Sequence, residues 1–330
     1  MVMGRLEMPA TIRLVLLVAG LGNTNAKLRS QVAFEARRMS PLSDVRYIDN
    51  GVIRLGVDLL RGGSISFLAD SKNLINVINT HDMGREVQLS FYADPSFYNP
   101  PTAQYPGGAC DKLFGGQEWP WNPIGAGDID GNRGEIVSFQ QTATLIHLVT
   151  RPLQWACHNV SCECTFEQTV ELFGTGARVN ATLHNARTDI SSSAPHDQEL
   201  PAVYVNGPYY RLISYSGSSP FTSGPTTEYS TSPHVPWHPG KFAATERWAA
   251  LVNEGNWGLG VINPDQETFL GGFAGNPGSG GSDDDPTGYL APVAQLSLNP
   301  QETYAFTFFL VLGDLETIRA YAYEHRDLQI

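Results

Sequence analysis

A polar segment from His81 to Gln88 contains several residue types that can carry acid–base chemistry. His81 titrates near neutral pH and can act as a general acid or base. The planar guanidinium of Arg85 can hold a carboxylate or a pair of neighbouring hydroxyl groups. Polar side chains fall on both sides of this stretch, which is unusual for a strand inside a sandwich and suits one that lines a groove. The alternative is a buried ion pair of Arg85 with Asp82 or Glu86.

Two carboxylates elsewhere in the chain can complete such a site. Glu199 lies next to Pro201, where a loop enters a strand, and Glu246 lies beside Arg247 and Trp248. A solvated acidic loop explains Glu199 equally well. The candidate catalytic residues are His81, Arg85, Glu199 and Glu246.

These residue types allow two different reactions on a glycan. Two carboxylates across a groove suit glycoside hydrolysis, with one as the acid and the other as nucleophile or base. A His or Tyr base near an Arg suits β-elimination from a uronic acid, because the Arg neutralises the substrate carboxylate and acidifies the neighbouring C–H. The sequence contains the residues for both reactions and does not rank them.

The loop from Gly116 to Pro123 places Trp119 and Trp121 beside amide and carboxylate side chains. Sugar rings expose apolar C–H faces, so flat aromatic side chains next to hydrogen-bonding groups bind them well. Burial in the core is the other account of these tryptophans, although the flanking prolines favour a loop. The candidate substrate-binding residues are Gln88, Tyr92, Trp119, Trp121, Asn122, Trp155, Tyr204, Tyr209 and Tyr210.

The four cysteines are Cys110, Cys157, Cys162 and Cys164. An even number in an exported chain predicts two disulfides, for which three pairings are possible. We expect Cys162 and Cys164 to bond elsewhere, because a spacer of one residue strains a direct bridge. A zinc site built from cysteines and His158 is the alternative, but the spacing is not that of a known zinc finger.

No metal and no cofactor is expected from the remaining motifs. Asp283–Asp285, in a Gly-rich loop, can take a structural calcium ion, but a solvated acidic loop is the favoured interpretation. The sequence contains neither a phosphate-binding Gly loop followed by Lys nor a His-Glu-x-x-His helix.

Short strands and tight turns must position these residues. Val52–Leu59 and Ser64–Leu68 alternate around a Gly-Gly turn, and Thr165–Phe173 and Ala177–Leu183 form a second hairpin. One short helix is predicted over Thr317–Glu324, capped by Asp314. Further predicted strands are Ile136–Phe139, Ala143–Thr150, Ala249–Val252, Leu259–Ile262 and Thr303–Leu312. The pattern predicts an all-β sandwich with long loops and very little helix.

Composition and charge limit the classes of function. The 42% hydrophobic and 16% charged residues are typical of a globular chain, and a net charge of −12 disfavours nucleic-acid partners and anionic membranes. Arg5 and Arg13 flank an apolar run that is too short to span a bilayer, which predicts a signal peptide over residues 1–26. A buried β-strand is the other interpretation of that run. We therefore expect a secreted chain with one domain over residues 27–330, whose oligomeric state the sequence does not predict.

Four places in the sequence resemble the galactose mutarotase-like superfamily, which includes aldose 1-epimerases. They are the Gly62-Gly63-Ser64-Ile65 turn, the strands from Val170 to Asn185, Trp119-Pro120-Trp121, and Leu298-Asn299-Pro300-Gln301-Glu302 before the last strand. The resemblance implies a large twisted β-sandwich with a sugar across one sheet. The histidine pair and the base glutamate of that superfamily have no counterpart at matching positions, so the resemblance bears on fold more than on activity.

We accordingly expect a secreted enzyme that cleaves a poly- or oligosaccharide by hydrolysis or elimination, or that rearranges one. Export favours work on polymers over simple anomer exchange, so an epimerase of the mutarotase type is an alternative. A non-catalytic glycan-binding module is another, because a pure binder needs the aromatic side chains but no convergent acid and base.

Overall fold

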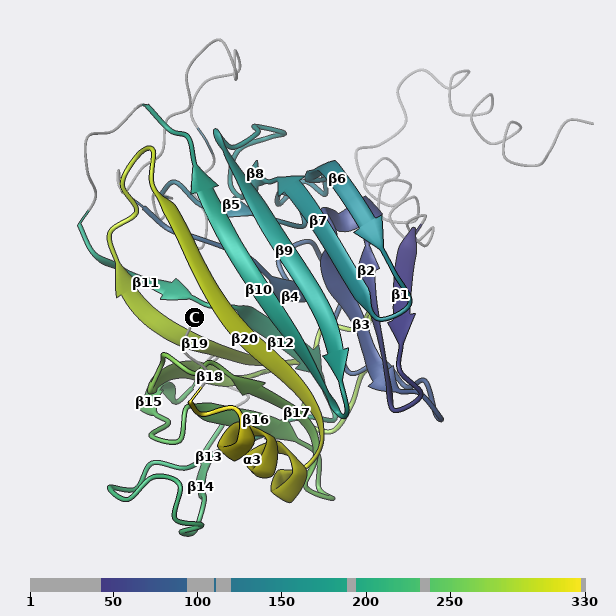
Figure 1. Cartoon of the computed structure of the whole chain (residues 1–330), viewed down its shortest axis with the longest axis vertical. Coiled ribbons are helices and arrows are strands. Elements are labelled where there is room, and N and C mark those ends of the chain that lie inside the picture. The colour runs from purple at the N-terminus through teal and green to yellow at the C-terminus, as the bar shows by residue number, and fades with distance from the viewer. Residues whose placement is uncertain (1–42, 94–109, 111–119, 189–193, 232–237, 328–330) are drawn as a thin grey trace, which may run out of the picture. The chain divides into compact units, whose positions relative to one another are not determined.

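The computed structural model describes residues 43–93, 110, 120–188, 194–231 and 238–327, and Asp44–Ile330 form one compact unit. Two large antiparallel sheets of nine strands each pack against one another (Figure 1). The all-β sandwich predicted from the sequence is therefore confirmed. The predicted signal peptide, residues 1–26, lies outside the described residues.

The first sheet carries most of the candidate site. Its strands, in order across the sheet, are β1 (Val45–Asp49), β2 (Ile53–Asp58), β3 (Ser64–Asp70), β4 (Val87–Gln88), β12 (Ala202–Asn206), β19 (Thr287–Leu296), β18 (Thr268–Ala274) and β15 (Gly240–Ala243), and β11 (His196–Glu199) also pairs with β19. β2 and β3 form the first predicted hairpin, joined by the short 3-10 helix η1 (Leu59–Arg61). The left-handed φ angles of 57° and 72° at Gly62 and Gly63 explain why glycine occupies this turn.

The second sheet contains the longest strands. In order they are β14 (Thr227–Tyr229), β13 (Arg211–Ser214), β16 (Trp248–Val252), β17 (Trp257–Ile262), β20 (Thr303–Asp314), β10 (Gly176–Asn185), β9 (Cys164–Phe173), β7 (Leu145–Arg151) and β6 (Glu135–Gln141). β9 and β10 are the second predicted hairpin. A separate pair, β5 (Pro123–Ile124) and β8 (Leu153–Gln154), lies in the connections.

The hydrophobic core lies between the two sheets, and strand alternation decides which side chains enter it. On β12, Val203 and Val205 belong to this core, whereas Tyr204 belongs to a small separate cluster with Tyr289 and Ala291. Residues that alternate along a strand point to opposite faces. Tyr204 therefore lies on the outer face of the first sheet, away from the core.

The helix α3 (Leu315–Glu324) packs on the outer face of the second sheet (Figure 1). Asp314 caps it by accepting a hydrogen bond of 2.8 Å from the backbone N–H of Thr317, as the sequence predicts. Ile318 and Tyr321 bury their side chains against the sheet. No helix in the described part of the chain is long and apolar enough to cross a membrane.

All four cysteines are bridged, as Cys110–Cys157 and as Cys162–Cys164. The expectation that Cys162 and Cys164 bond elsewhere is wrong. It assumed an extended chain, but the backbone bends at Glu163 and brings the two Cα atoms to 5.0 Å, within the usual range for a disulfide. No cysteine is left as a zinc ligand, and the two bridges point to an oxidising compartment.

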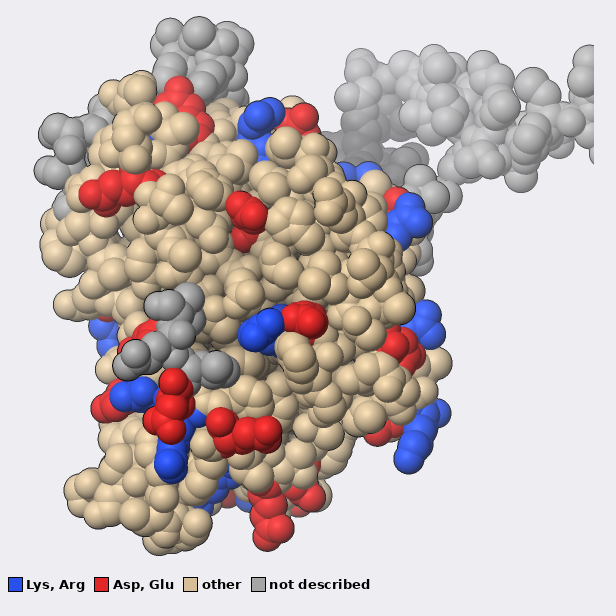
Figure 2. Space-filling view, viewed as in Figure 1, with Lys and Arg blue, Asp and Glu red and all other residues tan. Residues whose placement is uncertain are grey.

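The face drawn in Figure 2 carries scattered basic side chains, several of which lie beside acidic ones. Two of the ion pairs of the second sheet are Arg178 with Glu171 at 2.8 Å and Arg151 with Glu135 at 2.7 Å. Exposed pairs of this kind contribute little to stability.

Candidate functional site

Glu199 stands among phenol groups on the outer face of the first sheet. β11 pairs with β19 so that Glu199 lies opposite Val293, and alternate side chains of β19 share its face. Tyr289 is one of them, and its hydroxyl donates a hydrogen bond to the Glu199 carboxylate. The ring of Tyr204 on β12 lies 5.0 Å from that of Tyr289. A partly exposed carboxyl and neutral phenols thus share one surface.

The surroundings favour the protonated form of Glu199. Burial raises the pKa of this carboxyl, the hydrogen bond from Tyr289 opposes the rise, and the negative charge of Asp197 adds to it. Burial and the charge of Glu199 also raise the pKa values of Tyr92, Tyr204 and Tyr289. The phenols therefore stay neutral hydrogen-bond donors around a carboxyl that holds its proton to higher pH than usual.

Arg85 borders the same region but is fully engaged by protein groups. Its Nε lies 3.3 Å from Asp82, its Nη2 lies 2.9 Å from the carboxylate of Asp285, and its Nη1 donates to the Asp285 carbonyl at 2.6 Å. The charges of Asp82 and Arg85 both act on the pKa of Tyr204, which places the pair near the phenol cluster. The predicted pairing of Arg85 with Asp82 is therefore present, but the carboxylates of Asp82 and of the additional partner Asp285 are exposed and the pair is not a buried one.

His81 lies on an exposed segment tied to the loop that carries Asp283. Its Nδ1 is 2.9 Å from the Asp283 carbonyl oxygen, and the backbone N–H of Thr80 donates to the carbonyl of Ser282 at 2.6 Å. The structure gives His81 no contact with Glu199. The predicted triad of His81, Arg85 and Glu199 is therefore not assembled by direct contacts.

Glu86, beside Arg85, is wholly buried and pairs with Arg61, whose Nη1 lies 2.6 Å from Glu86 Oε1. Burial raises the pKa of Glu86 to about 8, although Arg61 opposes the rise. Glu86 thus forms a buried ion pair, but with Arg61 and not with Arg85 as the sequence suggested. A buried side chain of this kind cannot touch a ligand from the solvent.

Glu246 lies in a different part of the chain, beneath α3. Its carboxylate accepts two hydrogen bonds from Arg319, at 2.7 and 2.9 Å, and others from Trp248, Tyr323 and the backbone of Phe221. Burial alone would raise the pKa of Glu246, but these hydrogen bonds outweigh it and lower the pKa. With every oxygen engaged, Glu246 acts in this structure as the anchor of α3.

Trp121 is fully buried, and the guanidinium of Arg187 lies 4.0 Å from its ring centre. Core packing, the alternative interpretation, therefore describes Trp121 here, because a sugar cannot reach its faces. Trp119 lies outside the described residues.

Trp155 is the partly exposed tryptophan of this region. It packs beside Gly84, where an added Cβ would come within 2.8 Å of the indole ring. Its backbone N–H donates to the carbonyl of Asn122 at 2.9 Å. The side chain of Asn122 is buried and holds Ser90 and the Phe91 carbonyl, so Asn122 positions the loop.

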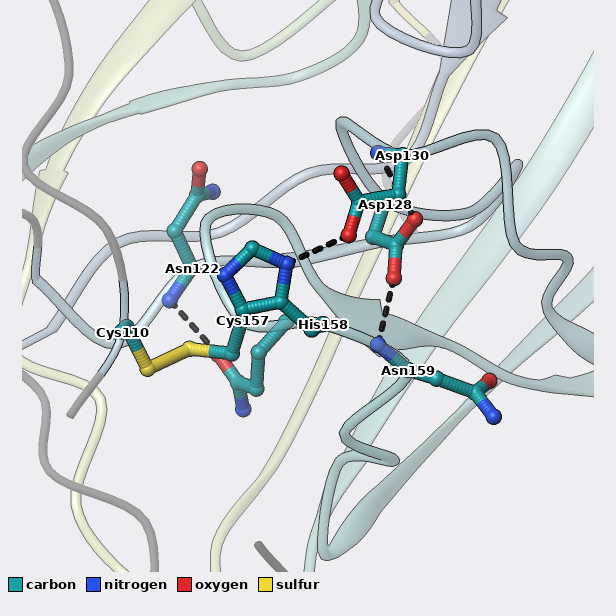
Figure 3. Close-up of a disulfide and its surroundings, with 8 residues drawn as sticks. Cys110, Asn122, Asp128, Asp130, Cys157, His158 and Asn159 are labelled. Atoms are coloured by element: carbon teal, nitrogen blue, oxygen red, sulfur yellow. Dashed lines mark hydrogen bonds and ion pairs between the residues drawn. A yellow bond between two sulfur atoms is a disulfide. The ribbon is translucent and has the colours of Figure 1, made fainter. Parts of the chain in front are cut away.

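Figure 3 shows how the turn after β8 is held near Asn122. The Cys110–Cys157 disulfide closes one side, and the Asn122 backbone N–H donates to the side chain of Gln154 at 2.9 Å. On the other side His158 pairs with Asp130.

The other predicted binding residues divide between the site and its surroundings. Gln88 faces the Glu199 side of the sheet but is 2% exposed and donates to the Met83 carbonyl at 3.2 Å. Tyr209 and Tyr210 follow β12, and their rings pack near Trp257 and Phe273. Tyr210 also donates a hydrogen bond to Glu254. These contacts give the two tyrosines structural partners outside the phenol cluster.

Sequence analysis missed Tyr289 and Asp197 as site residues. β19 was not predicted, because Pro292 lies inside it and proline argues against a central strand. Asp197 lies two residues before Glu199, a spacing that places both side chains on one face if the segment is a strand. The pairing of β11 with β19 links positions about a hundred residues apart, which periodicity does not reveal.

The Asp283–Asp285 loop does not gather its carboxylates. Asp283 accepts from Thr80, Asp284 accepts from the backbone of Gly281, and Asp285 pairs with Arg85. Among the described residues, no group of three His, Cys, Asp or Glu side chains is arranged to hold a metal ion.

No protein-family model matches the sequence, and no curated protein matches it. Among solved structures, a galactose mutarotase-like protein from Lactobacillus casei matches 82% of this chain and all of its own, with a TM-score of 0.48 and 12% identity. A galactose mutarotase related enzyme from Lactobacillus acidophilus matches 82% of this chain and 97% of its own, with a TM-score of 0.46 and 8% identity. An alpha-galactosidase from Lactobacillus brevis matches 87% of this chain over 42% of its own, with a TM-score of 0.47 and 9% identity. At 8–12% identity, the likeness to these three structures is one of fold alone.

Proposed function

We propose that this chain is an exported carbohydrate-active enzyme that hydrolyses a glycosidic bond, with Glu199 as the general acid. One observation carries the proposal: on the outer face of a sheet, the partly exposed residue Glu199 has a carboxyl whose pKa is raised by burial and which Tyr289 hydrogen-bonds. Such a carboxyl holds its proton to higher pH than an ordinary glutamate and can give it to a leaving-group oxygen.

The phenols around Glu199 fit a sugar as the ligand. Tyr92 and Tyr204 are partly exposed, stay neutral, and offer both an aromatic face and a hydroxyl. Aromatic faces contact the apolar C–H groups of sugar rings, and phenol hydroxyls pair with sugar hydroxyls. Trp155 adds a further partly exposed aromatic surface near Arg85.

Hydrolysis is favoured over elimination by the state of Arg85. Elimination from a uronic acid needs a cation that is available to neutralise the substrate carboxylate. All three nitrogens of Arg85 already face Asp82, Asp285 or Asn79. A neutral sugar has no carboxylate to neutralise, so its hydrolysis does not require the Arg85 guanidinium.

We further propose that residues 1–26 are a signal peptide and that 27–330 form a single domain in an oxidising compartment. The two disulfides support that compartment. The proposal does not include a membrane or nucleic-acid partner.

Incubation of the protein with a panel of neutral and uronate-containing glycans tests this function. We expect a new reducing end with a neutral glycan, and we expect Glu199→Gln to lower turnover by about 10²-fold or more. Glu135→Gln, on the exposed edge strand β6, is the matched control and should leave turnover and melting temperature unchanged. A panel that is bound but never altered would instead establish a non-catalytic binding module, and an unsaturated uronyl product would establish elimination.

A further inference from the structure

We propose that Asp197 is the second carboxylate of this site and acts as the base that activates water opposite Glu199. The inference rests on the proposed function, since it assigns a partner to the acid named there. It also predicts the stereochemistry of the reaction, which is inversion at the anomeric carbon.

The placement of Asp197 follows from the strand. Asp197 and Glu199 are two residues apart on β11 and therefore project from the same face, while Gln198 between them points the other way and bonds to the backbone of Tyr92. Two positions along a strand separate the Cα atoms by about 6.6 Å, so side chains that project in parallel carry their carboxyl groups at a similar spacing. Inverting glycosidases hold their carboxyl groups about 6.5–9.5 Å apart, with room for a water molecule, whereas retaining enzymes hold them at about 5–5.5 Å.

The two carboxyl groups have different surroundings, as an acid and a base require. Glu199 is held by the Tyr289 phenol, and among the described residues no cation is recorded as acting on its carboxyl. Asp197 is paired with Lys241 of β15 and accepts from Gln295 of β19 at 3.4 Å. The charge of Asp197 acts in turn on the Glu199 carboxyl, and the side chains of Asp197 and Lys241 are 38% and 48% exposed. Asp197 thus has a counter-ion and access to water, while Glu199 keeps a proton.

The reaction balances with these two groups and one water molecule. The water oxygen bonds to the anomeric carbon while the bond from that carbon to the leaving oxygen breaks. Glu199 gives its proton to the leaving oxygen, and Asp197 takes one proton from the water. Proton exchange with solvent then restores both groups, and no oxidant, metal or further reactant is consumed.

Three variants test the assignment with a glycan that the wild type cleaves. Asp197→Asn should lower kcat by about 10²-fold or more with little change in KM. Lys241→Met keeps Asp197 but removes its ion-pair partner, so kcat should fall by less than in Asp197→Asn while KM stays unchanged. Asp265→Asn, in an exposed turn, is the matched control and should change neither.

Product analysis by proton NMR completes the test, because the first anomer released should be inverted. Normal turnover in Asp197→Asn, or release of the retained anomer, would overturn the role of Asp197 while leaving Glu199 as the acid. Normal turnover in Glu199→Gln would instead overturn the proposed function itself. Melting temperatures of all variants distinguish either result from a failure to fold.

Discussion

At the scale of single residues, the hydrogen bond between Tyr289 and Glu199 controls the protonation of the candidate acid. Burial raises the pKa of Glu199 and this hydrogen bond lowers it. Tyr289→Phe removes the lowering contribution, so the pKa of Glu199 should rise further. The alkaline limb of kcat/KM, which reports loss of the acid proton, should therefore move to higher pH, as measured in a pH–rate profile.

Tyr47→Phe provides a control for that measurement, because Tyr47 lies on the edge strand β1 and packs against Phe67. It should leave the pH profile of the wild type unchanged. A limb that stays in place or moves to lower pH in Tyr289→Phe would show that Glu199 is not the titrating acid.

The sequence predicted Glu199 as a site residue but could not predict its partners. A carboxylate beside Pro201 at the start of a strand is visible in the sequence, whereas the phenol of Tyr289 reaches it only through pairing of distant strands. Trp121 illustrates the opposite error, since its proline-rich context suggested a loop surface and the structure buries it. Burial depends on tertiary contacts, such as the stacking of Arg187, that no local pattern records.

At the scale of elements, the sequence predicted those elements whose contacts join residues close together in the chain. The two hairpins with glycine turns and the helix capped by Asp314 occur as predicted, with β9 and α3 each extending one or two residues beyond the expected bounds. The strand β19 escaped prediction because Pro292 interrupts its pattern, although it lies between β12 and β18. Pro292 has no N–H to donate, but its carbonyl still accepts a hydrogen bond from the backbone of Leu200.

The attachment of α3 to the second sheet depends on Glu246. Glu246→Gln removes the charge that balances Arg319, whose side chain is 16% exposed, and breaking one partner of a buried ion pair costs about 3–5 kcal/mol. We expect a loss of this order in the free energy of unfolding, measured by urea denaturation, and an unchanged kcat for the fraction that remains folded. Glu267→Gln, which loses an exposed pair with Arg247, should cost less than about 1 kcal/mol. A large loss of kcat with an unchanged free energy of unfolding would show that Glu246 is a catalytic residue and contradict its structural role.

At the scale of the whole molecule, charge and covalent bonds point to work outside the reducing cytosol. The chain carries a net charge of −12, and in the ion pairs described for the site its cations face carboxylates, as Arg85 and Lys241 do. An acidic surface suits a neutral substrate better than a polyanion, because like charges repel. The two disulfides, Cys110–Cys157 and Cys162–Cys164, fit the same location, because such bridges persist in oxidising compartments.

Export makes a specific prediction about the purified native protein. If residues 1–26 are a signal peptide, the mature N-terminus should be Lys27, because cleavage is expected after the small residue Ala26. Non-reducing peptide mapping by mass spectrometry should then find one bridge between Cys110 and Cys157 and another between Cys162 and Cys164. The same digest after reduction and alkylation is the control, and it should release all four cysteines as modified thiols. An intact Met1 together with four free thiols would contradict export. A chain that stays in a reducing compartment neither loses its signal peptide nor forms these disulfides.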